Sequence, residues 1–355
     1  MSTLRAAVVG LGWAGQQHVK SWDAREDAEL VGIAGLEDDR RRELAARYGV
    51  PERAGLEALL DATAPDVLSI ATPTALHAPM AITAMNRGIH VLVEKPMAMS
   101  GEEARRMVEA ATRNRVVCEV VLNHRLRGEV RALAAEVAAG TLGEIRYAKA
   151  GWLRRAGIPG SGSWFTRAEL SGGGALADIG VHVLDIVLHL LGRPRVRHVT
   201  ATTAAVFGPR GLGSSGYAAG SGPAPFDVED LAAAMLLADG VTVCLETSWA
   251  QLRERDRCYV ELHGSLGGAF LELSKRPEGV APLTIVTGDP AAPEVRTPEF
   301  GEALRHAGVV DDFVRELRAG QGPDRRGGHQ GRDLAEIVDA CYASSRSGAP
   351  VSLPG

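Results

Sequence analysis

The sequence predicts an α/β protein in two parts: a doubly wound parallel sheet, then an α+β domain with an open, mainly antiparallel sheet. Up to about residue 123, short apolar runs alternate with helix-compatible stretches, an order typical of right-handed crossovers that place helices on both faces of a sheet. Beyond that point strand-like runs are joined by tight turns, which favours antiparallel pairing. We therefore expect one domain over residues 1–123 and a second over 124–355, whose C-terminal helices can pack back on the first.

Hydrophobic periodicity places the elements of the first domain. The expected strands are Ala6–Val9, Leu30–Gly35, Val67–Ile70, Ile89–Val93 and Val116–Leu122. The expected helices between them are Ala14–Trp22, Arg40–Tyr48, Ala75–Arg87 and Gly101–Arg113.

The second domain begins with a predicted helix over Glu129–Ala139, a strand over Glu144–Trp152 and one long apolar helix over Gly174–Leu191. Asp239-Gly240 between two apolar runs is a strong hairpin signal. The expected hairpin strands are Ala232–Ala238, Val241–Trp249, Tyr259–His263 and Ala269–Leu273, and the late helices are Arg305–Arg318 and Asp333–Ser344. Residues 207–225 are rich in Gly, Ser and Pro, which predicts a mobile loop.

Composition is that of a globular chain: 355 residues, 45% hydrophobic and 23% charged, with a formal net charge of −5. This charge gives no broad attraction to nucleic acid or to an anionic membrane. No apolar run looks long enough to span a bilayer, and the N-terminus enters a strand at once, without room for a signal peptide. The four cysteines are widely spaced and form no CxxC. We expect a cytoplasmic protein with no nucleic-acid or membrane partner.

The first predicted strand runs into Gly10-x-Gly12-x-x-Gly15, and a helix follows. Gly10 allows a tight turn, Gly12 lets backbone amides approach a pyrophosphate, and Gly15 lets the helix pack close to the strand. A bare glycine-rich turn is the alternative, but the strand, turn, helix and strand order matches the dinucleotide fingerprint. We expect a Rossmann domain, with the first helical residues Trp13 and Ala14 at the phosphates.

Two further segments close predicted strands of the parallel sheet. Ligands of such sheets bind outside the carboxyl ends of the strands, so Thr72-Pro73 and Glu94-Lys95-Pro96 are expected cofactor contacts. Lys95 is also expected at the substrate, with a surface lysine as the alternative. His77 is either a cofactor contact or a packing histidine.

The long apolar helix carries Asp178, His182, Asp185 and His189 at spacings of four, three and four, which would place them on one stripe. A polar stripe on a buried helix needs partners or serves a site. Asp178 could orient His182 as an acid–base group; a buried Asp–His hydrogen-bond network is the alternative. A metal centre lacks an obvious third ligand set, so we expect no metal.

Jointly, these motifs resemble the glucose-fructose oxidoreductase / inositol dehydrogenase / rhizopine catabolism (Gfo/Idh/MocA) family. The resemblance rests on the glycine turn, Ala71-Thr72-Pro73…His77, Glu94-Lys95-Pro96 and Gly172-Gly173-Gly174…Asp178-x-Gly180-x-His182-x-x-Asp185, and it extends to Ser344…Val351. It implies NAD(P)-dependent oxidation or reduction at a secondary alcohol of a sugar, sugar derivative or cyclitol. It also implies Lys95, Asp178 and His182 as catalytic residues, and an open second-domain sheet used for oligomerisation.

Two departures from the family pattern affect the expectations. Gly35 stands where an acid usually binds the adenosine ribose, which leaves NAD or NADP open as the cofactor. Phe165 stands where relatives often carry a basic residue.

A sugar-like small molecule is the expected substrate. Segments expected to face it carry Asn123, Arg125, Trp152, Arg154, Arg155, Trp164 and Arg167, although the tryptophans could instead be core residues. An uncovered apolar sheet face would need a partner, so a homodimer or homotetramer is expected. The alternatives to a dehydrogenase are a cofactor-bound sensor on the same fold and an NAD-assisted glycosidase.

Overall fold

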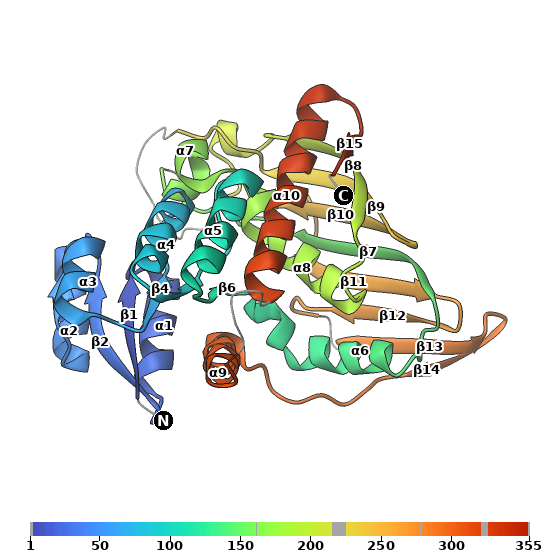
Figure 1. Ribbon diagram of the computed structural model, residues 1–355. Coiled ribbons are helices and arrows are strands. Elements are labelled where there is room, and N and C mark those ends of the chain that lie inside the picture. The colour runs from blue at the N-terminus through green and yellow to red at the C-terminus, as the bar shows by residue number, and fades with distance from the viewer. Residues whose placement is uncertain (1–2, 161, 215–224, 277–278, 321–325, 354–355) are drawn as a thin grey trace. The chain divides into compact units, whose positions relative to one another are not determined.

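A computed structural model describes residues 3–160, 162–214, 225–276, 279–320 and 326–353 (Figure 1). The chain forms two compact units. The first unit comprises residues 1–123 and 304–335, and the second comprises residues 124–303 and 336–355. Most of the expected loop over residues 207–225 lies outside the described residues, and Gly208–Arg210 forms a short 3₁₀ turn.

The first unit is a Rossmann sheet of six parallel strands in the order β3-β2-β1-β4-β5-β6. The strands are β1 (Leu4–Val9), β2 (Ala28–Ala34), β3 (Glu52–Arg53), β4 (Val67–Ile70), β5 (His90–Val93) and β6 (Cys118–Val120). The helices are α1 (Trp13–Asp23), α2 (Asp38–Tyr48), α3 (Leu56–Thr63), α4 (His77–Asn86), α5 (Gly101–Asn114) and α9 (Arg305–Arg318). The strand order reverses between β1 and β4, so the carboxyl ends of these strands form the switch point where ligands bind.

Sequence reasoning missed β3 and α3, because a two-residue strand and an eight-residue helix are too short for a periodic signal. It did find α9, whose place in the first unit depends on tertiary contacts. Phe313 of α9 meets Trp22 of α1 edge-on, with ring centroids 6.5 Å apart, and both side chains are fully buried.

The second unit contains a nine-stranded sheet in the order β14-β13-β12-β11-β7-β10-β9-β8-β15. Its strands are β7 (Ile145–Leu153), β8 (Val196–Ala204), β9 (Leu231–Ala238), β10 (Val241–Ser248), β11 (Arg257–Gly264), β12 (Gly267–Glu272), β13 (Leu283–Asp289), β14 (Ala292–Arg296) and β15 (Val351–Ser352). All pairs are antiparallel except β7 with β10, so the expected open, mainly antiparallel sheet is confirmed. The hairpin at Asp239-Gly240 is confirmed too, with Gly240 at φ +78°. Strands β8, β13, β14 and β15 were missed.

Helix α6 (Gly128–Ala138), the π-helical turn η4 (Leu176–Gly180) and α8 (Val181–Leu190) contact this sheet, and α10 (Arg326–Ser347) crosses the boundary between the units. The helix expected over residues 174–191 is therefore present, with one correction: its first part, Leu176–Gly180, is a π turn rather than regular α-helix. Ala168–Leu190 also corrects the expectation about membrane-length runs: it is long and apolar enough to cross a bilayer, yet 89% of its apolar window is buried inside the structure.

The strand register separates two faces of the sheet. Val243, Leu236 and Val260 lie on one face and are fully buried. Met235 and Phe270 share the other face and are 44% and 39% exposed. This second face also carries charged side chains, so it is mixed in character rather than apolar as the sequence suggested.

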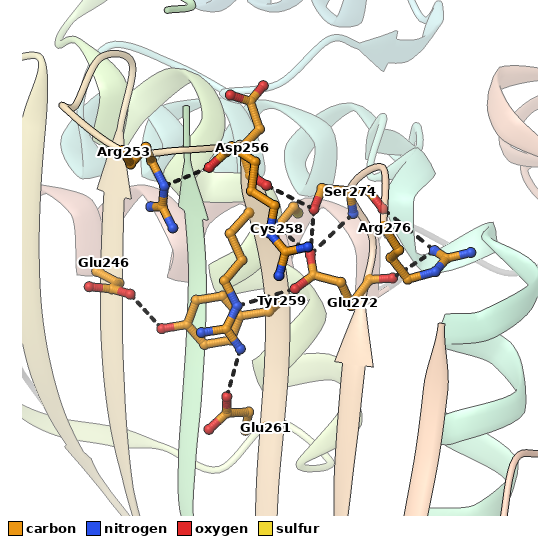
Figure 2. A network of polar contacts seen from close by, with 11 residues as sticks. Glu246, Arg253, Asp256, Cys258, Tyr259, Glu261, Glu272, Ser274 and Arg276 are labelled. Carbon is orange, nitrogen blue, oxygen red and sulfur yellow. Dashed lines mark hydrogen bonds and ion pairs between the residues drawn. The ribbon is translucent and has the colours of Figure 1, made fainter. Parts of the chain in front are cut away.

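The polar part of this second face centres on Tyr259 (Figure 2). Its hydroxyl donates to Glu246 at 2.6 Å, and the Arg257 guanidinium lies 3.9 Å from the centroid of its ring. Arg257 also pairs with Glu261 at 2.9 Å and with Glu272 at 3.2 Å. Burial and the contact with Glu246 raise the pKa of the Tyr259 hydroxyl, which stays protonated as a donor.

Candidate active site

The glycine turn between β1 and α1 depends on close backbone approach. A Cβ added to Gly15 would lie 1.8 Å from the carbonyl oxygen of Gly10. Gly10 itself has φ +88°, and a Cβ there would lie 2.4 Å from the carbonyl oxygen of Ala71. A side chain on Gly15 would push α1 away from β1, and one on Gly10 would collide with the backbone that follows β4.

Gly12 differs from its two neighbours in the motif because nothing lies within 4 Å of an added Cβ. It is the N-cap of α1, and its backbone is extended. The first amides of a helix have no intrahelical acceptor, so those of Trp13 and Ala14 are available to an anion. Open space beside Gly12 and these amides fits a dinucleotide pyrophosphate.

The carboxyl end of β2 is where an adenosine ribose would be bound. Gly35 follows β2, and its carbonyl accepts a bond of 2.8 Å from buried Arg41, which also pairs with Glu52. Leu36 is 84% exposed.

The segments after β4 and β5 are joined by His77. Its Nδ1 lies 2.8 Å from the carbonyl oxygen of Pro96, and its Nε2 lies 2.9 Å from that of Thr72. The ring is 1% exposed, and burial lowers its pKa. This geometry favours the packing alternative for His77, while a direct cofactor contact stays a prediction.

Lys95 follows β5 by two residues and precedes Pro96 across a cis peptide bond. Its neighbour Glu94 is 8% exposed. Oε1 of Glu94 lies 3.1 Å from Nε2 of His18 and 3.2 Å from Nε2 of His306. The Lys95 amide donates to Oε2 at 3.2 Å. The backbone on the N-terminal side of Lys95 is thus held by a buried carboxylate.

In the second unit, Asp178 lies in the π turn and His182 in the first turn of α8. The Trp249 indole donates to Asp178 at 2.9 Å. Asp185, one turn further on, binds Arg125 and, at 2.6 Å, Arg193. A π turn thus separates Asp178 from the regular helix that carries His182, Asp185 and His189, and the two carboxylates have different partners; one continuous polar stripe stays a prediction.

His182 lies against an aromatic group that includes one predicted residue and one that was missed. The ring centroids of His124 and His182 are 4.3 Å apart, and that of Trp152 lies 5.4 Å from His124 and 5.9 Å from His182. The Arg154 guanidinium lies 4.9 Å from the centroid of Trp152. Trp152, Arg154, His124 and His182 thus form one side of a group suited to a hydroxylated ring: aromatic faces for C–H bonds and polar tips for hydroxyls.

The other predicted substrate residues have different surroundings. The Arg125 guanidinium is engaged by buried Asp185, and the Trp164 ring stacks on Phe165 at 3.8 Å. Asn123 belongs to the first unit, where its Nδ2 lies 3.4 Å from Nδ1 of His306. Substrate contact by these three residues stays a prediction.

The glycine run before the π turn is explained by Glu229. Its carboxylate accepts bonds of 2.8 Å from the amides of Gly174 and Leu176, and one of 3.0 Å from the Tyr342 hydroxyl. A Cβ on Gly173 would lie 1.9 Å from that hydroxyl oxygen. Burial raises the pKa of Glu229 against the effect of these bonds. This contact fixes where the segment that carries Asp178 and His182 begins.

Sequence reasoning missed His18, His306, His124, Trp249 and Glu229. A signal existed for His18, which stands one helical turn after Gly15 on the tightly packed helix α1. His124 lies between the predicted residues Asn123 and Arg125, so a signal existed for it too. His306, Trp249 and Glu229 come from distant parts of the chain and had no such signal.

Comparison with known proteins agrees with this geometry. Residues 4–122 match the domain described as "Oxidoreductase family, NAD-binding Rossmann fold", and residues 130–270 match the "GFO/IDH/MocA C-terminal domain". The chain belongs to the GFO/IDH/MocA family of oxidoreductases. It is an oxidoreductase with a nicotinamide-dinucleotide-binding fold.

Several relatives match over nearly the whole chain. D-glucoside 3-dehydrogenase of Escherichia coli (strain K12) is 33% identical over 99% of this chain and 98% of its own length. Inositol 2-dehydrogenase of Rhizobium meliloti (strain 1021) is 24% identical over 99% of both chains. The structure of levoglucosan dehydrogenase in complex with NADH and levoglucosan matches with a TM-score of 0.83 at 23% identity, covering 99% of this chain and 100% of that one, which supports the fold.

Gly15 is packed against backbone and Gly12 faces open space, so substitutions there should cause different defects: one in stability, the other in cofactor binding. Gly15→Ala should lower the free energy of unfolding by about 1–3 kcal/mol, because the new Cβ meets backbone that cannot move aside. Gly12→Val should keep its stability and lose nicotinamide-dinucleotide binding, because its side chain occupies the open space at the α1 amides. Urea denaturation and calorimetry measure the two effects. Unchanged binding by Gly12→Val would contradict the assignment of this turn.

The buried ion pair of Asp185 predicts a pH-dependent loss of stability. Despite burial, Arg125 and Arg193 lower the pKa of Asp185, so its contribution is full above the unfolded value of about 3.9 and is lost as pH falls through the folded pKa. Asp185→Asn should cost about 3–5 kcal/mol at pH 7 and less in acid. Urea denaturation at pH 7 and in acid measures the loss of unfolding free energy, and Asp239→Asn, at an exposed carboxylate, is the matched control. Equal losses for the two variants would refute it.

Proposed function

We propose that this oxidoreductase transfers hydride between a nicotinamide dinucleotide and a secondary alcohol or ketone of a sugar, sugar derivative or cyclitol. The observation that carries the proposal is the combination of an open glycine turn with an acid–base set. A sensor would need the turn but not Lys95 and His182. Relatives that act on glucosides, levoglucosan and inositol support the substrate class.

The cofactor supplies a hydride acceptor or donor. The side chains transfer the hydroxyl proton and stabilise the negative charge on the substrate oxygen. His182 takes the hydroxyl proton during oxidation and returns it during reduction. Lys95 stabilises the developing alkoxide with its ammonium group. Asp178, held by the Trp249 indole, keeps His182 basic. Trp152 and His124 present ring faces to the sugar.

The surroundings of β2 support NAD(H) over NADP(H). A 2′-phosphate needs a cation near the end of β2. Three of the four arginines there have carboxylate partners: Arg40 pairs with Glu37, Arg41 with Asp38 and Glu52, and Arg42 with Asp38. The fourth, Arg53, pairs with Ala34 of β2 and donates to the carbonyl of Glu52. A 2′-phosphate would compete with these acids.

The mixed face of the second-unit sheet supports a homodimer or homotetramer. Met235, Leu237 and Phe270 are exposed there beside Lys149 and Glu246, which line the same hollow as Met235. Apolar side chains with charged neighbours suit an isologous interface. The free thiols of all four cysteines support a reducing, cytoplasmic location.

The catalytic assignment predicts graded losses of turnover. His182→Ala should lower kcat by about two to four orders of magnitude, the usual size of acid–base effects, and leave cofactor binding intact. Lys95→Ala should also lower kcat. The losses of the two single variants should not add fully in the double variant, because both groups act on one oxygen. Asp178→Asn should lose less than His182→Ala.

Steady-state rates over a range of pH, on a panel of sugars and polyols with NAD and NADP, provide the measurement. Wild-type turnover in all three variants would refute the catalytic roles. Turnover with no net change in nicotinamide absorbance would instead favour the glycosidase alternative.

The assembly proposal predicts that Met235→Asp shifts the oligomer towards monomer, because it places unpaired charge in the interface. Light scattering at micromolar concentration measures this. Leu252→Asp is the matched control, since Leu252 is 94% exposed and lies outside the strands. A monomeric wild-type protein would refute the proposal.

A further inference from the structure

The carboxylate of Glu94, at the end of β5, accepts hydrogen bonds from several parts of the first unit. Three N–H groups reach it: one from His18 of α1, one from His306 of α9 and the Lys95 amide. His18 is fully buried, and His306 is 7% exposed. Side chains from two separate helices and one backbone amide thus converge on one buried carboxylate within the first unit.

The hydrogen-bond pattern shows which atoms carry protons. An ionised carboxylate can only accept, so an Nε2 N–H of each histidine faces Oε1 of Glu94. Oε1 of Glu94 therefore accepts from His306 and from His18. Burial raises the pKa of Glu94, but the bonds from the two histidines outweigh it and hold the pKa far below its usual range. Glu94 is a fixed negative charge inside the protein.

The position of Glu94 after β5 places its charge on the side of the sheet where the second half of a dinucleotide would lie. The glycine turn follows β1, and the strand order reverses between β1 and β4, so a dinucleotide lies across the strand ends with its second half over the β4–β5 side. Glu94 is the first residue after β5. Lys95 is the next residue, and its positive charge has the opposite effect on a cation.

We propose that Glu94 sets the redox preference of the bound cofactor, stabilising the cationic oxidised nicotinamide against the neutral reduced one and offsetting Lys95. His18 and His306 are positioning residues that keep this carboxylate in place. The inference rests on the proposed function, since it requires a nicotinamide dinucleotide as ligand. At an effective dielectric constant of about 20, one charge about 12 Å from the nicotinamide is worth about a tenfold difference in affinity between the two redox forms.

The test compares the dissociation constants of NAD⁺ and NADH by calorimetry and NADH fluorescence. Glu94→Gln should weaken NAD⁺ about tenfold more than NADH, because it removes the charge and keeps the shape. His306→Ala keeps the charge but removes one of the two imidazole donors that hold it, so the ratio of the two constants should shift in the same direction as in Glu94→Gln and by less. Glu109→Gln, which removes an exposed carboxylate from α5, is the matched control and should change neither constant. Thermal melts establish that each variant is folded.

Three results would overturn the proposal. Equal weakening of both redox forms by Glu94→Gln would make Glu94 a scaffold for Lys95 alone. The ligand atoms of Glu94, His18 and His306 lie within 4.8 Å of one another, so these residues could also bind a cation. Stoichiometric zinc in the purified protein would therefore mean that the carboxylate charge is already neutralised. Failure of the wild-type protein to bind either redox form would refute the proposed function itself.

Discussion

The close contact between the start of α1 and the strand ends of the first unit is the constraint on which most of the site depends. Gly15 allows this contact because even one methyl group would overlap the Gly10 carbonyl. With α1 held against the sheet, His18, one turn further along, reaches Glu94 at the end of β5. A backbone requirement at one strand therefore also determines the electrostatics at another.

Buried carboxylates organise both units, and each is satisfied differently. Glu94 accepts from two imidazoles and an amide, whereas Asp185 is paired with two guanidinium groups; both have lowered pKa values. Glu229 accepts from two amides and a phenol, none of them charged, and its pKa is raised by burial. The difference follows from the donors, because only guanidinium or imidazole partners offset the desolvation of a carboxylate here. Asp185 and Glu229 fix helix positions, while Glu94 is followed directly by Lys95, the lysine proposed to act in catalysis.

The start of the helical segment in the second unit shows how a site departs from regular structure. Glu229 binds the amides of Gly174 and Leu176, and a π turn follows. Such turns are rare and are frequent at functional sites, because they change the direction of a side chain without ending the helix. Here the turn lets Asp178 meet the Trp249 indole while Asp185, on regular helix, meets Arg125 and Arg193.

The amino-acid sequence by itself indicated the Rossmann topology and the glycine turn, because these depend on local periodicity and on spacing within one segment. The joint resemblance of its motifs to a known family pointed to Lys95, Asp178 and His182. The sequence also indicated the hairpin at Asp239-Gly240, whose turn chemistry is local. Only the tertiary structure decided that Arg125 binds Asp185, that Trp249 holds Asp178, and that His306 joins His18 on Glu94. Those partners lie 60, 71 and 212 residues apart along the chain, and no periodic pattern encodes contacts at that range. Buried polar groups must find partners wherever the packed elements supply them, and that choice is made by the fold.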